Sequence, residues 1–257
     1  RSPSRGLGDV YKRQVLSLLE DKTNIYARKI ALGMKTQFGW KELTYDGLGL
    51  MSRRLAAYLM NDLGIQRGEK LAILSESKPE YGACVFASVI SGLITVPLDI
   101  KLTKYELQSI LSDCLPSVML VSQSYIDKAL ELQKAIPSLK HIIVMDEHPV
   151  NENLQSIYTI PNNYTCKWRH RSRKSVVFII YTSGTTGNPK GVETTFGNML
   201  AQLKDLKTAF NQILPYGDVR VLSILPMNHL FEMTVGFSTF FCLLYTSPSP
   251  RDGLLSR

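Results

Sequence analysis

The sequence predicts an α/β fold with mostly parallel sheets flanked by helices. Apolar runs without alternation, such as Lys70–Ser75 (KLAILS) and Val176–Tyr181 (VVFIIY), are typical of strands that are buried on both faces. Amphipathic segments with apolar residues at helical spacing separate these runs, and strand and helix alternate four times. This alternation favours a parallel sheet with helices packed on it.

Local signals place the ends of the elements in the first half of the chain. The expected strands are Lys70–Ser75, Leu93–Pro97, Ser117–Val121 and His141–Met145. The expected helices are Glu42 to about Leu63, Pro79 to Val89 or Ile90, the segment after Thr103, and Tyr125–Ala135. Gly64 ends the first helix, Pro79 opens the second, and Thr103 forms a capping box with Glu106 at the third.

The second half adds a polar connector, a buried strand, a helix and another buried strand. In chain order these are residues 147–166, Val176–Tyr181, Phe196–Ile213 and Val219–Ile224. Thr194 or Thr195 starts the helix. The last strand leads into Leu225–Glu232 (LPMNHLFE).

A glycine- and hydroxyl-rich segment, Thr182–Lys190 (TSGTTGNPK), directly follows the strand that ends at Tyr181. Its hydroxyl residues and glycines are Thr182, Ser183, Gly184, Thr185, Thr186 and Gly187. Small residues let backbone N–H groups turn toward an anion, hydroxyls add donors, and Lys190 supplies a mobile positive charge. A simple turn between a strand and a helix is the alternative. The common phosphate loop is excluded, because Gly191 stands where that motif has Ser or Thr.

Residues 182–192 (TSGTTGNPKGV) resemble the signature loop of the AMP-forming adenylating enzymes, which include acyl-CoA ligases, luciferases and peptide-synthetase adenylation domains. Residues 42–74 and 92–111 resemble structural segments of the same family. The likeness runs from about residue 20 to about residue 240 and implies the incomplete N-terminal domain of an adenylating enzyme. It also implies that the loop wraps the phosphates of ATP, with Thr182 near Mg²⁺.

His229 lies after the end of a predicted strand, where ligands of open α/β sheets bind. A lone histidine is more often simply exposed or hydrogen-bonded. LPMNHLFE, however, resembles the family landmark in which a histidine lies beside the carboxylate substrate. The resemblance implies that His229 shapes the wall between acyl pocket and nucleotide. Three nearby apolar residues are either acyl contacts or core packing: Phe231, Met233 and Phe237.

The resemblance implies an ATP-dependent acid–thiol ligase, closest to the long-chain fatty acyl-CoA ligases. The carboxylate of a medium- or long-chain fatty acid would attack the α-phosphate of ATP with Mg²⁺, and the thiol of CoA would take the acyl group. Such steps depend on positioning and charge stabilisation, so His229 and Lys190 are the catalytic candidates. The alternatives are an acyl-carrier-protein synthetase, a ligase for another acid, and a non-catalytic nucleotide-binding module.

The family places further motifs C-terminal to this part of the chain. They are an aromatic-Gly-x-Thr-Glu segment, a ribose-binding aspartate, a hinge and a catalytic lysine. None lies between His229 and Phe241, so the 257-residue chain is itself expected to lack ligase activity.

Both ends of the chain are expected to be translated sequencing adapter. A DNA segment that encodes Ser4–Gln14 (SRGLGDVYKRQ) has a reverse complement that encodes Cys242–Asp252 (CLLYTSPSPRD). Unrelated natural tails would not be complementary, and such segments are excluded from fold reasoning. We expect residues 1–14 and 242–257 to be adapter, and residues 15–241 to be a partial N-terminal adenylation domain.

The formal charge of +8 does not indicate a nucleic-acid-binding surface. Half of it lies in residues 1–14 and 242–257, and the run Lys167–Lys174 alone holds five cations and no acid. That run is either a solvated loop or a contact for anionic lipid headgroups or CoA phosphates. Cys84, Cys114 and Cys166 show no metal-binding spacing, and they favour a reducing, cytoplasmic location. A contact of Lys167–Lys174 with lipid headgroups would place the protein at the surface of a membrane.

Overall fold

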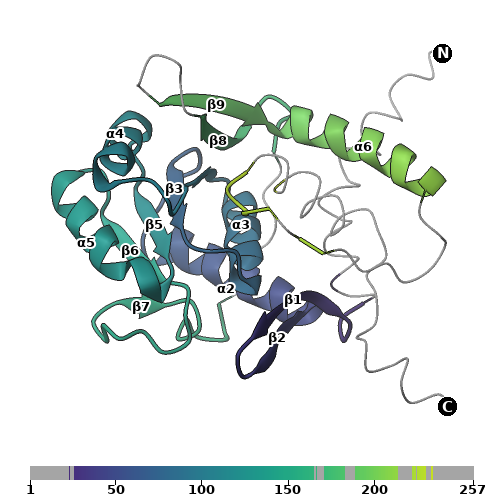
Figure 1. The fold of residues 1–257 in the computed structure, drawn as a ribbon, viewed down its shortest axis with the longest axis horizontal. Helices are drawn as coiled ribbons and strands as arrows, with labels where there is room; N and C mark the ends of the chain where they lie inside the picture. Colours follow the sequence, from purple (N-terminus) through teal and green to yellow (C-terminus); the bar gives the residue numbers. More distant parts are fainter. Residues whose placement is uncertain are drawn as a thin grey trace.

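Figure 1 shows the computed structural model of the chain, which describes residues 23, 26–164, 166, 171–182, 189–213, 222–223, 225–229 and 233. These residues form a seven-stranded sheet in the order β7-β6-β5-β3-β4-β8-β9. The strands are β3 (Lys70–Leu74), β4 (Ile94–Pro97), β5 (Val118–Val121), β6 (His141–Val144), β7 (Gln155–Ser156), β8 (Val176–Thr182) and β9 (Lys190–Thr195). All neighbours pair in parallel except β8 and β9, which confirms the mostly parallel sheet.

Helices cover both faces of this sheet. One face carries α2 (Tyr45–Asn61), α3 (Pro79–Ser91) and the start of α6 (Phe196–Ile213), which share an apolar cluster with Leu71, Leu120 and Phe178. The other face carries the 3-10 turn η1 (Gln123–Tyr125) with α4 (Lys104–Cys114) and α5 (Ile126–Ala135); the two helices pack on Ala72 and Val121. Figure 1 shows α4 and α5 together on the side of β5 and β6 that lies away from α2 and α3.

The predicted helix boundaries are largely confirmed by their caps. Thr103 Oγ1 accepts from Glu106 N at 3.4 Å, and Glu106 Oε2 accepts from Thr103 N at 2.8 Å, which completes the capping box. Gly92 ends α3 in the left-handed region at φ 84°, which glycine adopts without steric cost. Thr195 Oγ1 accepts from Asn198 N at 3.2 Å and caps α6.

Three segments differ from the expected pattern. Residues 42–44 belong to a hairpin of β1 (Ile30–Thr36) and β2 (Gly39–Thr44), and Thr44 caps the helix that follows. The connector contains the two-residue strand β7, and residues 190–195 form β9. Of the expected strand 219–224 the structure describes only Leu222 and Ser223, which lie outside a strand; β9 already pairs with the free edge of β8.

Candidate functional site

The base of the predicted phosphate loop is the loop end of a β-hairpin. β8 ends at Thr182, β9 begins at Lys190, and these two residues are paired across the strands. Both are exposed. Five predicted loop residues lie outside the described part of the chain: Ser183, Gly184, Thr185, Thr186 and Gly187. The structure therefore describes the two strand ends that flank this loop.

Strand alternation fixes the side of the sheet to which this pair belongs. Phe178 and Ile180 of β8 pack in the cluster of α2 and α3, whereas Ile179 packs in the cluster of α4 and α5. Because side chains alternate along a strand, Thr182 lies on the α3 side, and its cross-strand partner Lys190 shares that face.

Tyr181 ties the hairpin to helix α4. It packs on the α4 and α5 cluster, and its hydroxyl donates to the carboxylate of Asp113. A Cβ at the paired residue Gly191 would lie 3.1 Å from Tyr181 Cζ and 2.8 Å from Ile179 Cγ2, so the ring of Tyr181 occupies the space above this glycine. Burial, followed by the bond to Asp113, raises the pKa of the Tyr181 phenol, which keeps it a hydrogen-bond donor.

His229 lies on a segment that docks beside the N-terminus of α3. Met227 N donates to Ser77 Oγ at 3.1 Å, and Met227 is buried in the α2 and α3 cluster. His229 N donates to Pro226 O at 3.0 Å, while its side chain is exposed. Met233 N donates to His229 O at 2.9 Å. In Figure 1 the described part of this segment, in yellow, passes beside α3.

The residues that flank the predicted loop and the described part of the His229 segment therefore lie at the same edge and on the same side of the sheet. Ser77 follows β3, and β3, β4 and β8 are consecutive parallel strands, so their carboxyl ends meet at one edge. Open α/β sheets bind ligands at this edge. Met227 and Thr182 both lie on the α3 side, which is the arrangement expected for a site between His229 and the loop.

Side chains fill the point of this edge where the strand order reverses, between β3 and β5. Lys78 Nζ is buried and lies 2.5 Å from Asp146 Oδ1, and Ser122 Oγ donates to Glu76 Oε2 at 2.5 Å. These four polar groups satisfy one another. The open part of the edge lies instead toward β8 and β9, where Thr182 and Lys190 are exposed.

The basic run 167–174 is not one solvated unit. Arg171 is 3% exposed and donates to Val89 O at 3.2 Å and to Ser88 O and Val176 O at 3.1 Å each. It neutralises the carbonyls that end α3 and joins them to β8. Burial, with a smaller effect of Arg67, lowers its pKa to about 10. Arg173 and Lys174 are exposed, and residues 167–170 lie outside the described part.

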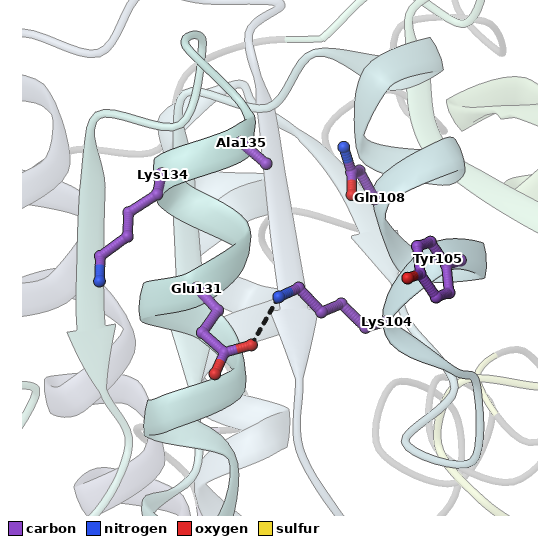
Figure 2. Close-up of a pocket in the computed structure, with 6 residues that line it drawn as sticks. All are labelled: Lys104, Tyr105, Gln108, Glu131, Lys134 and Ala135. Atoms are coloured by element: carbon purple, nitrogen blue, oxygen red, sulfur yellow. Dashed lines mark hydrogen bonds and ion pairs between the residues drawn. The ribbon is translucent and has the colours of Figure 1, made fainter.

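A surface groove of about 430 Å³ between α4 and α5 is a different feature (Figure 2). Lys104 Nζ spans it to Glu131 Oε2 at 2.7 Å, and this lysine lowers the pKa of Glu131. The groove lies on the helix layer opposite α3, so it is not the loop site. Within the described ranges no helix is long and apolar enough to cross a membrane, and no three His, Cys, Asp or Glu residues are grouped to hold a metal ion.

Sequence reasoning missed the residues that position the site. Tyr181 with Asp113, and Ser77 with Met227, are pairs separated by 68 and 150 residues. Gly191 offered a signal, because a glycine in a strand often marks a close approach. Met233, left open between acyl contact and core, is fully buried in the α2 and α3 cluster; Phe231 and Phe237 lie outside the described part.

Curated proteins with a similar sequence include long-chain-fatty-acid–CoA ligases. The long-chain-fatty-acid–CoA ligase ACSBG1 of Homo sapiens is 28% identical over 252 residues, which cover 90% of this chain and 34% of that protein. The long-chain-fatty-acid–CoA ligase of Salmonella typhimurium is 28% identical over 247 residues, covering 83% and 44%. The chain thus spans less than half the length of these relatives.

Solved structures show the same fold. A red-emitting luciferase from Phrixothrix hirtus superposes with a TM-score of 0.77 at 20% identity, covering 91% of this chain and 44% of the luciferase. The sequence model of the family described as AMP-binding enzyme matches residues 19–247. On this match, the chain belongs to the AMP-binding enzyme family.

Proposed function

We propose that this chain supplies the ATP-phosphate side and part of the carboxylate side of an AMP-forming acid–thiol ligase. The observation that carries the proposal is the pair of Thr182 and Lys190 at the loop end of the β8–β9 hairpin. The loop between them would wrap the triphosphate of ATP, and Lys190 would oppose the charge that builds up on the phosphates as pyrophosphate leaves.

The residues at the hairpin base suit this ligand. A lysine ammonium and a threonine hydroxyl are donors for phosphate oxygens. Mg²⁺ is usually held by one or two protein oxygens together with substrate phosphates and water. The Thr182 hydroxyl would be one of those oxygens.

The carboxylate side would be bounded by the segment around His229. Its backbone is held by Met227 on Ser77, which leaves the exposed imidazole at the carboxyl edge of the sheet. We assign His229 a positional role against the acid. The ACSBG1 and Salmonella relatives are long-chain-fatty-acid–CoA ligases, which supports a fatty acid as the acyl donor and CoA as the thiol.

A pyrophosphate-release assay with ATP, CoA and palmitate tests the proposal on the protein encoded by the complete reading frame. We expect turnover that requires all three substrates and falls about tenfold or more in Lys190→Ala, since a charge-assisted contact to phosphate is lost. Lys174→Ala is the matched control, because Lys174 is another exposed lysine that lies just before β8, at the end of the hairpin away from Thr182 and Lys190. Binding of ATP without turnover on any acid would assign the chain to a non-catalytic nucleotide-binding module.

A further inference from the structure

The β1–β2 hairpin turns one face to the protein and the other to solvent. Cross-strand pairing places Gly33 opposite Glu42 and Lys35 opposite Trp40, so these residues share one face, and all four are exposed. The residues that alternate with them are half-buried: Leu32, Met34, Lys41 and Leu43. The hairpin is therefore held by its inner face, and its outer face and turn remain available.

Two large aromatic side chains lie at the tip of this hairpin. Phe38, in the turn, is 92% exposed, and Trp40 is 58% exposed. Trp40 Cε3 lies 3.8 Å from the position that a Cβ of Gly33 would occupy, so the indole lies along the outer face of β1. Single exposed apolar residues are common, but two within three residues form a patch on a protruding element.

Positive charge exceeds negative charge along this hairpin and the residues just before it; Arg28 and Lys29 precede β1, at the end away from the turn, and Lys35 and Lys41 lie within the strands. Residues 26–41 contain Arg28, Lys29, Lys35 and Lys41 and no acidic residue. Lys41 is bound by Glu80 of α3, whereas no carboxylate of the described residues forms an ion pair with Arg28 or Lys35. The acidic Glu42 on the outer face lies farther from the turn than Trp40.

We propose that the tip of the β1–β2 hairpin inserts into the interface of an anionic lipid bilayer. Tryptophan and phenylalanine enter the headgroup region, while lysine and arginine stay in water and contact anionic headgroups. Protein interfaces are depleted in lysine, so Lys35 directly opposite Trp40 favours lipid over a protein partner. The contact is independent of the proposed ligase activity. It moves the expected membrane contact away from the run 167–174, whose Arg171 is buried.

Co-sedimentation of the full chain with lipid vesicles tests the proposal. We expect binding to phosphatidylcholine vesicles that contain about 30% phosphatidylglycerol and little binding to phosphatidylcholine alone. The double variant Phe38→Ser/Trp40→Ser should lose about tenfold in partition, and Lys35→Gln roughly fivefold. The matched controls are Tyr105→Ser, at an aromatic residue that is 83% exposed on α4, and Lys134→Gln on α5; both should bind like the parent chain.

The fluorescence of Trp40 reports directly on the environment of the hairpin tip. In a Trp168→Phe background, the emission of Trp40 should shift to the blue and be quenched by brominated lipids when anionic vesicles are added. Absence of that shift, or hairpin variants that bind like the parent chain, overturns the proposal. Loss of binding in Arg173→Gln/Lys174→Gln instead would overturn it in favour of the basic run. A hairpin variant that changes the oligomeric state but not vesicle binding would overturn it in favour of self-association.

Discussion

Thr182 and Lys190 face each other at the loop end of the β8–β9 hairpin, as the last residue of one strand and the first of the next. A loop lysine would have to be brought to the phosphates from a mobile segment. Here the backbone of Lys190 is fixed by strand pairing, and only its side chain has to move. The cost of ordering the lysine on a ligand is therefore reduced to its side chain.

Removing the Tyr181 hydroxyl should loosen this hairpin. In Tyr181→Phe the bond to Asp113 is lost while the ring stays over Gly191, so we expect a loss of about 1 kcal/mol in the free energy of unfolding. Amide exchange in β9 should also become faster. Tyr164→Phe is the control, because Tyr164 makes the same kind of bond to Asp62 far from the hairpin. Equal exchange in β9 for both variants would contradict a tethering role for Tyr181.

Adding a methyl group at Gly191 should disturb the same packing. The new Cβ of Gly191→Ala would lie 2.8 Å from Ile179 Cγ2, so the Ile179 side chain or the strands must shift, at a cost of about 1–3 kcal/mol in urea unfolding. Gly33→Ala is the matched control, since this strand glycine also has an aromatic ring beside it but its nearest contact is 3.8 Å away. A Gly191→Ala variant as stable as Gly33→Ala would show that the ring of Tyr181 does not require a glycine.

The basic run should divide into a structural and a surface part. Arg171→Met leaves the carbonyls of Ser88 and Val176 without this donor, and we expect a loss of about 2–4 kcal/mol in stability. Arg173→Met should change stability by less than about 0.5 kcal/mol, because Arg173 is exposed. Thermal or urea unfolding of the two variants measures the difference. Similar values for both would contradict the buried role of Arg171.

Two buried thiols should make the fold sensitive to alkali. Burial raises the pKa of Cys114 to about 12 and moves the pKa of Cys84 upward as well. In the unfolded chain both thiols ionise near pH 8.5, as free cysteines do. Above about pH 8.5 the folded state therefore binds more protons, and stability falls by up to roughly 1.4 kcal/mol per pH unit for each thiol.

Urea unfolding at about pH 8 and about pH 10 measures this slope. Cys84→Ala removes one ionisable group and should make the slope shallower, whereas Cys166→Ala, at a half-buried cysteine, is the control. Stability that does not change between these pH values would contradict the burial of the two thiols.

Much of the α/β core could be predicted from sequence because its signals are local. Apolar runs such as Val176–Tyr181 and caps such as Thr103 need no distant partner to be recognised. β9 was missed because KGVETT is polar, and its strand conformation comes from pairing with β8. The β1–β2 hairpin also carries a local signal, the alternation of Ile30, Leu32 and Met34 with smaller or polar residues along β1.

The candidate site likewise contains residues that local sequence patterns predict and residues that they do not. Thr182, Lys190 and His229 stand out because their motifs are contiguous in the sequence. Two hydrogen bonds hold these residues in place: Tyr181 to Asp113, and Met227 to Ser77. Each bond joins segments that are distant in the sequence, so no local pattern predicts it.

Binding of MgATP to the chain itself, measured by isothermal titration calorimetry, is the most direct test of the central claim. That claim is that the loop end of the β8–β9 hairpin, at Thr182 and Lys190, holds the phosphates. We predict that Lys190→Ala weakens binding about tenfold and Thr182→Ala by a smaller factor, while Lys174→Ala has no effect. Equal affinities for the Lys190→Ala variant and the parent chain would contradict the account.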